Sequence, residues 1–246
     1  MIQFIYHSTK KLALGARSYW SGILSLPYPN NCSICSAEHS IEKSKLCLLC
    51  LSELPFTFYE KDLKTSRVAE VFFGRAKIKN VYAMLFFETG NYTQKLLHKL
   101  KYENDKELAK YLGTLIGEKL KAESLNDKID YYIPVSLHSK KEFTRGYNQS
   151  EVLAEGISEI LPAPILNHFV KKKKHNSSQT KKNRQDRIDN VTDLFYVSES
   201  SVLTGKHIVL VDDVLTTGAT LESIANTLHQ AVPQLQISIF TLAFAK

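Results

Sequence analysis

Four cysteines, the only ones in the chain, form two C-x-x-C pairs: Cys32 with Cys35, and Cys47 with Cys50. The two-residue spacing lets both thiolates of a pair face one ion, and two such pairs supply the four sulfurs of a tetrahedral Zn²⁺ site. A closed four-cysteine site is structural. We therefore expect zinc to hold residues 30–60 together, as a module that scaffolds or binds rather than catalyses.

Other interpretations of the cysteines are weaker. Disulfide bonds are the main alternative, and a cytosolic location disfavours them. A redox C-x-x-C motif fits poorly because two pairs lie side by side and neither opens a helix after a strand. His39 lies between the pairs, but four sulfurs already complete the zinc shell.

A second group of chemically active residues follows the apolar stretch 207–211. Asp212 and Asp213 come first, and a hydroxyl-rich loop then leads into a helix expected over Thr220–His229. The free N–H groups and partial positive charge of a helix N-terminus favour a phosphate, and Gly218 lets the backbone approach it closely. The loop and helix start consist of Val214, Leu215, Thr216, Thr217, Gly218, Ala219 and Thr220.

The two carboxylates would repel a phosphate bound by this loop, so they must face vicinal hydroxyls or a cationic centre. A sugar phosphate meets both demands, with its phosphate in the loop and its ribose hydroxyls on Asp212 and Asp213. The alternative is a generic strand–loop–helix in which the threonines cap the helix and the acids are solvated.

The elements that must position these residues alternate along the C-terminal part of the chain. Apolar runs predict strands at 80–88, 130–135, 165–170, 193–197, 207–211 and 236–245. Helical spacing of leucines and isoleucines predicts helices around Leu96–Leu100 and over 105–121, 149–161 and 220–229. This order predicts an α/β domain over 80–246, with a doubly wound, mostly parallel sheet whose ligands bind beyond the carboxyl ends of the strands.

The excess positive charge is concentrated in residues 171–187. Asp186 is the only acid there, and the excess in this segment equals the net charge of +7 of the whole chain. A long basic loop in a phosphate-binding fold suits a polyanion such as pyrophosphate or nucleic acid, although a lysine run can also be a solvated surface. Its basic residues are Lys171, Lys172, Lys173, Lys174, Lys181, Lys182, Arg184 and Arg187.

Composition and length exclude several classes of protein. With 246 residues, 43% hydrophobic and 23% charged, the chain is typical of a globular protein of one or two domains. No apolar run approaches the roughly 18–20 residues of a membrane span, and Lys10, Lys11 and Arg17 interrupt a signal-peptide core. We expect a cytoplasmic protein, whose residues 1–29 pack on the body as an amphipathic helix or meet a membrane partner.

The stretch His207–Thr220 resembles the motif with which type I phosphoribosyltransferases bind 5-phosphoribosyl 1-pyrophosphate (PRPP): an apolar strand, two acids, two small or apolar residues, Thr-Thr-Gly and a further Thr. The resemblance implies that PRPP binds here together with Mg²⁺, which the ligand's own oxygens largely hold. It also implies that Asp212 and Asp213 are catalytic residues if the protein transfers the sugar.

Four blocks, taken in order, resemble the ComF family of competence proteins. They are the cysteine pairs followed by Glu53–Phe56, the segments 96–109 and 133–154, and the PRPP motif. The family is implicated in natural transformation and acts on incoming single-stranded DNA on the cytoplasmic side. The resemblance therefore implies single-stranded DNA and other DNA-uptake proteins at the inner membrane as partners, and a phosphoribosyltransferase-like C-terminal domain.

The same resemblance assigns further site residues. The turn Val135–His138 corresponds to the pyrophosphate loop, and Arg145 is placed to reach a phosphate. The basic loop 171–187 corresponds to the flexible loop that closes over PRPP. Two hypotheses follow: an enzyme that releases pyrophosphate from PRPP, or a protein that binds single-stranded DNA and keeps the PRPP pocket. Further candidates for phosphate contacts or base stacking are Lys95, Lys99, Lys101, Phe143, Tyr147 and Phe169.

Overall fold

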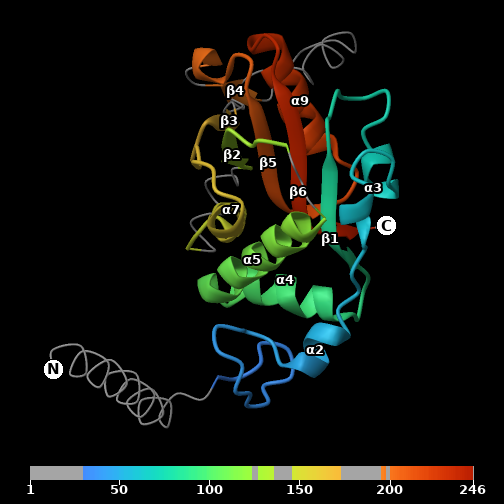
Figure 1. The fold of residues 1–246 in the computed structure, drawn as a ribbon, viewed down its shortest axis with the longest axis vertical. Helices are drawn as coiled ribbons and strands as arrows, with labels where there is room; N and C mark the ends of the chain where they lie inside the picture. The colour runs from blue at the N-terminus through green and yellow to red at the C-terminus, as the bar shows by residue number, and fades with distance from the viewer. Residues whose placement is uncertain (1–29, 124–126, 136–145, 173–194, 198–199, 246) are drawn as a thin grey trace, which may run out of the picture. The chain divides into compact units, whose positions relative to one another are not determined.

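The computed structural model describes residues 30–123, 127–135, 146–172, 195–197 and 200–245. The expectations for residues 1–29, for His138 and Arg145, and for the basic segment beyond Lys172 lie outside these ranges. Contacts divide the chain after Ser52 into two compact units. The first contains the four cysteines and the short helix α2 (Leu48–Ser52), and the second contains the sheet (Figure 1).

The second unit is built on four parallel strands in the order β1-β6-β5-β2. They are β1 (Val81–Phe87), β2 (Tyr131–Pro134), β5 (His207–Leu215) and β6 (Gln236–Ala245). Nearly every residue of β1, β5 and β6 before the carboxyl end is buried, as expected for a parallel sheet covered on both faces. The predicted α/β fold with a mostly parallel sheet is confirmed.

Helices cover the two faces of this sheet. The helices α4 (Tyr92–Tyr102), α5 (Lys106–Ala122) and α7 (Gln149–Ile160) form one layer, in which α7 packs against β2 and β5 and α4 against β1. The opposite face carries α9 (Ala219–Ala231) and the short α3 (Arg67–Glu70), which follows the 3-10 turn η1 (Tyr59–Lys61).

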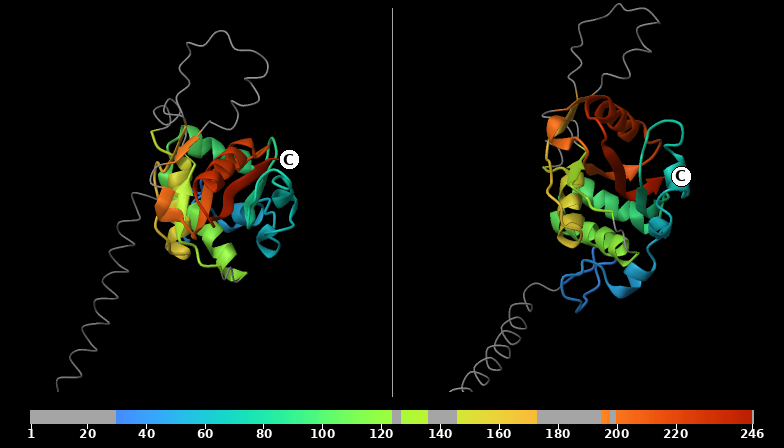
Figure 2. Two further views of the ribbon diagram at one scale, coloured as in Figure 1. Left: turned by 90° about the horizontal axis from the view of Figure 1, so that it is seen from above. Right: turned by 45° about the horizontal axis from the view of Figure 1, so that its top comes forward.

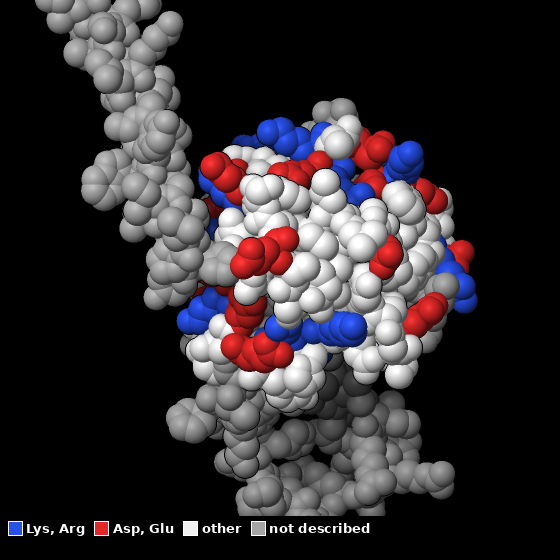
Figure 3. Space-filling model, turned by 90° about the horizontal axis from the view of Figure 1, so that it is seen from below, with Lys and Arg blue, Asp and Glu red and all other residues white. Residues whose placement is uncertain are grey.

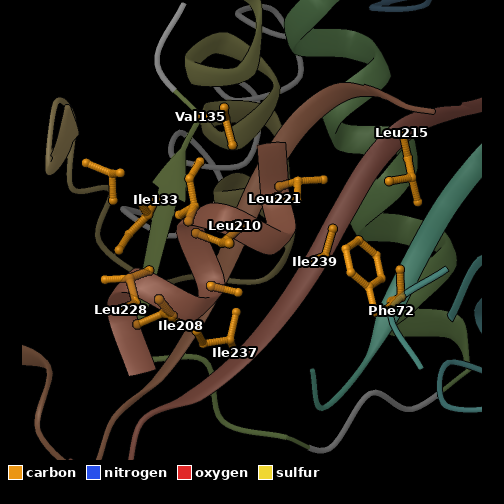
Figure 4. Packing of buried hydrophobic residues seen from close by; sticks show 14 of the residues in the cluster. Phe72, Ile133, Val135, Ile208, Leu210, Leu215, Leu221, Leu228, Ile237 and Ile239 are labelled. Carbon is orange, nitrogen blue, oxygen red and sulfur yellow. The ribbon is translucent and has the colours of Figure 1, made fainter. Parts of the chain in front are cut away.

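The core on the α9 face follows from strand alternation. Ile208 and Leu210 of β5 point the same way as Ile237 and Ile239 of β6, because side chains two apart share a face. These four side chains pack against the apolar face of α9, which includes Leu221 (Figure 4). This packing fixes β5, which carries the two acids, relative to α9, which follows it.

Helices α5 and α7 lie side by side in Figures 1 and 2, and glycines allow their close approach. A Cβ on Gly156 would lie 2.1 Å from the carbonyl oxygen of Lys110, and one on Gly113 would lie 2.3 Å from that of Leu153. Neither backbone atom can move aside without shifting a helix. The two glycines therefore set the position of α7, whose first turn reaches the carboxyl end of β5.

Two expectations about strands were wrong. Residues 165–170 are not a continuous strand: Ile165 makes one parallel bridge to Tyr132, and His168 then adopts a left-handed backbone with φ of 57°. A strand resumes only as β3 (Val170–Lys172), which pairs antiparallel with β4 (Phe195–Val197) in a separate two-stranded sheet, followed by the 3-10 helix η2 (Ser200–Leu203).

The second correction concerns β5, which we expected to end at Val211. It continues to Leu215 because β6 runs alongside it that far, pairing Asp212 with Thr241 and Leu215 with Phe244. The polar character of the two acids suggested a strand end, but the ladder with β6 overrides that local signal.

None of the helices within the described ranges is both long enough and apolar enough to cross a membrane.

Candidate functional site

The four cysteines of the first unit form one cluster. The sulfur atoms of Cys32, Cys35, Cys47 and Cys50 all lie within 4.8 Å of one another, and the Sγ atoms of Cys35 and Cys47 are 3.8 Å apart. A tetrahedron with Zn–S bonds of about 2.3 Å has S···S edges of about 3.8 Å. The cluster thus fits the expected structural zinc, which the four sulfurs would hold without an open coordination position.

The surroundings of the sulfurs also favour a cation. The amides of Ile34 and Cys50 donate to the sulfurs of Cys32 and Cys47, each at 3.5 Å. Burial alone would raise the pKa of Cys32, but backbone hydrogen bonds lower it to about 6. Burial and the neighbouring sulfurs raise the pKa of Cys50 far above its ordinary value. Without a cation the cluster cannot ionise fully, whereas a divalent ion would allow all four thiols to become ligands.

In the second unit, Asp212 and Asp213 lie at the carboxyl end of the sheet, within β5. Strand β2 ends at Pro134, opposite Val211, so β5 extends beyond its neighbour on that side. Val135 donates its amide to Val211 O at 2.9 Å, which starts the predicted pyrophosphate turn beside the acids. Both carboxylates are half-buried, and each already has a side-chain partner from a helix, α4 for Asp213 and α7 for Asp212.

Asp213 is paired with a lysine. Lys101 Nζ of α4 lies 3.0 Å from Asp213 Oδ2, with side-chain exposures of 24% and 15% respectively. The preceding carbonyl, Leu100 O, accepts hydrogen bonds from Tyr147 Oη at 2.9 Å and from Gln149 Nε2 at 3.1 Å. Because Tyr147 and Gln149 are buried, these bonds fix the last turn of α4 and thereby aim Lys101 at the acid.

Asp212 is held by the start of α7. The hydroxyl of Ser150 donates to Asp212 Oδ1 at 3.1 Å, and the amide of Asp213 donates to the same oxygen at 2.9 Å. Burial, followed by the charge of Asp213, raises the pKa of Asp212 to about 7, although both of these hydrogen bonds act in the opposite direction. Asn148 caps α7 through the Ser150 amide at 3.2 Å and also donates to Val135 O at 3.3 Å, which ties α7 to the end of β2.

The Thr-rich loop leads from β5 into α9 as predicted. The side chains of Thr216, Thr217 and Thr220 are exposed, whereas Leu215 belongs to the core and serves packing (Figure 4). Val214 is half-buried and Ala219 is the first residue of α9. Gly218, the N-cap, supplies no side-chain acceptor, and the Ala219 amide makes only a long hydrogen bond, 3.5 Å, to Thr217 Oγ1, so the first turn of α9 suits an anion.

Gly218 has a structural reason to be glycine. Its φ is 73°, and a Cβ there would lie 2.7 Å from Val71 Cγ1 and 3.1 Å from the Phe72 ring. Arg75 follows this apolar contact and donates to Thr217 O at 2.9 Å, while its other terminal nitrogen pairs with Glu222 of α9. Residues 71–75, which precede β1, therefore contact the loop at Thr217 and Gly218 and stabilise it.

Other predicted residues are placed differently. Tyr147 and Phe169 are buried and so do not offer faces for base stacking. Lys99 pairs with Glu103 at 2.8 Å, and Lys95 lies 5.3 Å from the centre of the Tyr92 ring. The backbones of Lys171 and Lys172 belong to β3. Phe143, like His138, Arg145 and the rest of the basic segment, lies outside the described residues.

Sequence reasoning missed the contacts of three residues at the site: Lys101 as the partner of Asp213, Ser150 as the donor to Asp212, and Arg75 as the support of the loop. The basic character of α4 was visible, and the segments containing Lys101 and Ser150 were part of the family resemblance. No signal in the sequence, however, paired these side chains with acids so far away in the chain.

Comparisons with known proteins agree with this architecture. The phosphoribosyl transferase domain family matches residues 148–246. Competence protein F from Haemophilus influenzae is 32% identical over 148 residues, which are 58% of this chain and 64% of that protein. Competence protein ComFC from Bacillus subtilis is 30% identical over 116 residues, 47% of this chain and 45% of that protein.

DNA utilization protein YhgH from Escherichia coli K12 is 29% identical over 139 residues, 54% of this chain and 59% of that protein. The chain thus spans less than two thirds of the length of each of these three relatives. Among solved structures, the purine phosphoribosyltransferase from Pyrococcus horikoshii matches at 18% identity, over 60% of this chain and 86% of that chain, with a TM-score of 0.33.

Four findings agree: the matched domain, the parallel sheet with its helices, the competence-protein relatives and the clustered cysteines. The chain is similar to the ComF competence proteins over about half of its length, and it combines a four-cysteine cluster with an α/β domain whose residues 148–246 match the phosphoribosyl transferase domain family.

Proposed function

We propose that this protein acts in the uptake or use of DNA during natural transformation, and that it binds PRPP in the site formed by Asp212–Thr220. The names of its relatives, competence proteins and a DNA utilization protein, support the first part. The observation that carries the second is that the two acids near the carboxyl end of β5 are followed by a short threonine-containing loop and the Gly218-capped start of α9.

The site provides a separate surface for each part of a phosphoribosyl ligand. The hydroxyls of Thr216, Thr217 and Thr220 and the N–H groups of α9 suit the phosphate, while the acids suit the ribose hydroxyls. The pyrophosphate end would extend toward the turn that begins at Val135. Mg²⁺ would accompany PRPP on the oxygens of the ligand, since it commonly binds through substrate phosphates.

The carboxylates of Asp212 and Asp213 already have partners, so they do not offer a ready site for Mg²⁺. Lys101 is bound to Asp213, and Asp212 accepts hydrogen bonds from Ser150 and from the amide of Asp213. A divalent ion on these oxygens would have to displace an ammonium group. No step of the proposed function therefore passes through a metal held by the protein at this place.

Single-stranded DNA is the second proposed ligand. The net charge of residues 171–187, after Asp186 is subtracted, equals the whole net charge of the chain, and the basic residues of this segment suit a phosphate backbone. On the face of the described surface shown in Figure 3, acidic and basic side chains are interspersed instead. We place the protein in the cytoplasm, where incoming DNA and other DNA-uptake proteins at the inner membrane would be its partners.

Calorimetric titration with PRPP tests the first ligand. The protein should bind PRPP, and Thr217→Val together with Thr220→Val should weaken binding by about tenfold, because two hydroxyl donors are lost. Ser201→Ala, in η2, is a control that should leave the affinity unchanged. A wild-type protein that is folded and zinc-loaded but binds no PRPP would refute this part of the proposal.

DNA binding is tested by fluorescence anisotropy with a labelled single strand at several salt concentrations. Affinity should fall steeply with salt, because bound phosphates release counterions. Replacement of Lys171–Lys174 by alanine should weaken binding to all sequences alike and reduce the salt slope. A salt-insensitive complex would contradict phosphate tracking.

A second candidate function is phosphoribosyl transfer, which the intact pair of acids beside the loop favours. In this reaction the bond from ribose C1 to pyrophosphate breaks, pyrophosphate leaves with the electron pair, and an acceptor nucleophile bonds to C1. Asp212 and Asp213 would stabilise the positive charge that builds on the ribose. Release of pyrophosphate that requires an acceptor and disappears in Asp213→Asn would establish it.

A further inference from the structure

The charge balance at the end of β5 poses a physical problem for any phosphorylated ligand. PRPP carries several negative charges, and two carboxylates lie where its sugar would bind. Like charges held this close repel strongly in a half-buried site, since the local dielectric screens them less than water does. A positive group at the acids is therefore needed before such a ligand can bind well.

Lys101 supplies that positive group. Its ammonium lies 3.0 Å from Asp213 Oδ2, and both side chains are largely shielded from solvent. The lysine comes from α4, outside the residues matched by the phosphoribosyl transferase family. Lys99, on the same helix, pairs instead with a local partner, the C-cap residue Glu103.

The position of Lys101 is built into the fold. The two buried side chains of Tyr147 and Gln149 converge on the carbonyl of Leu100, next to Lys101, from the segment that opens α7. The same segment carries Ser150, the donor to Asp212. One short stretch of chain thus places a hydroxyl on one acid and a lysine on the other.

We propose that Lys101 is the resident cation of this site: it holds the position on Asp213 that a divalent ion would otherwise take, and makes the acidic pair compatible with a polyanionic ligand. This inference rests on the proposed binding of PRPP and deepens it. It makes Lys101 a positioning and specificity-determining residue, and it predicts that binding of PRPP depends only weakly on Mg²⁺.

The first test uses Mn²⁺ alone, detected by electron paramagnetic resonance, on the full zinc-loaded chain. Wild type and the control Lys99→Met should bind no Mn²⁺ at the acids, whereas Lys101→Met, which removes the charge and keeps the length, should gain one site. That gained site should disappear when Asp213→Asn is added. Failure of Lys101→Met to gain a site would overturn the placement of Lys101 as a substitute for a divalent ion.

The second test measures PRPP affinity with EDTA and with excess Mg²⁺. Wild type and Lys99→Met should change by less than about threefold, and Lys101→Met should bind about tenfold more weakly in EDTA and recover with Mg²⁺. Lys101→Arg, which keeps the charge, should behave as wild type, and it serves as the decisive variant if Lys101→Met does not fold. Equal affinities of all variants in EDTA would overturn the proposal.

The two tests separate this inference from the function on which it rests. If wild type does not bind PRPP but Lys101→Met gains the Mn²⁺ site, the proposed ligand is wrong and the cation role of Lys101 stands. If wild type binds PRPP and Lys101→Met shows no change with Mg²⁺, the ligand is right and the role of Lys101 is wrong.

Discussion

The hydroxyl of Ser150, at the start of α7, donates a 3.1 Å hydrogen bond to Oδ1 of Asp212, which lies 62 residues further along the chain. The contact joins the helix layer to the carboxyl end of β5. It also leaves Asp212 in a half-buried position between a hydroxyl and a second carboxylate, so the protonation of this acid is coupled to folding.

The raised pKa of Asp212 predicts a pH dependence of stability. Its pKa is about 7 in the folded protein, because of burial and the charge of Asp213, and about 3.9 in an unfolded chain. The folded state therefore binds the proton more tightly, and this contribution to stability is complete below about pH 4 and is lost as the pH rises through 7. Urea unfolding should show a fall of about 1–3 kcal/mol from pH 5 to pH 8 that is absent in Asp212→Asn.

The comparison between the two proteins isolates this acid, because all other titrating groups are shared. His207, whose pKa is lowered chiefly by burial, acts in both and in the opposite direction. If wild type and Asp212→Asn show parallel pH profiles, Asp212 is ionised throughout and the assignment is incorrect.

Substitution of Gly218 should destabilise the protein through two separate effects. Gly218→Ala places a Cβ against Val71 and Phe72 and also forces alanine into a left-handed conformation, so we expect a loss of about 2–4 kcal/mol. Gly205→Ala is the matched control, because Gly205 has φ of 69° and a Cβ on it would meet no atom within 4 Å. Chemical denaturation should show a loss of only about 1 kcal/mol for the control. Equal losses would mean that the contact with Val71 and Phe72 contributes nothing.

Arg75 should affect ligand binding more than stability. Its side chain is 39% exposed, so loss of the ion pair with Glu222 should cost less than about 1 kcal/mol. Arg75→Ala also frees the carbonyl of Thr217, and the loop should then hold a phosphate less well. We expect PRPP affinity to fall by about threefold to tenfold in calorimetry, while Lys77→Ala leaves it unchanged. Unchanged binding in Arg75→Ala would show that the loop keeps its conformation without this support.

Removal of zinc should affect the first unit selectively. One zinc ion per chain is expected by mass spectrometry, and Cys50→Ser should abolish it, because the cluster supplies only four sulfurs. Limited proteolysis should then cleave residues 30–52 rapidly, while the sheet domain keeps its resistance, since each unit has its own internal contacts. Ser33→Ala, beside a ligand, is the control. Zinc retained by Cys50→Ser would exclude a four-sulfur site.

The parts of the site that the sequence predicted are local. The spacing of Cys32, Cys35, Cys47 and Cys50 dictates a cluster whatever the surrounding fold. The stretch from His207 to Thr220 likewise predicts a strand, two acids, a glycine turn and a helix, because all of these except the exact end of the strand are decided by neighbouring residues.

The parts that could not be predicted depend on which distant elements meet. The sequence offered Lys101 as a candidate for phosphate contacts, and only the packing of α4 against the segment that opens α7 directs it to Asp213. The end of β5 was misplaced because its continuation depends on the length of β6. Residues 165–170 are apolar enough for a strand, but the left-handed His168 interrupts them.

The order of strands in the sheet has a consequence for how the chain folds during synthesis. The outer strands β1 and β2 are made first, and the two central strands, β5 and β6, are made last. Until β6 leaves the ribosome, β1 lacks its parallel neighbour and β5 lacks one of its two, so the sheet cannot assemble piece by piece from the N-terminus. The nascent chain must keep these apolar segments from aggregating, and a truncated product lacking β6 would be a substrate for proteases.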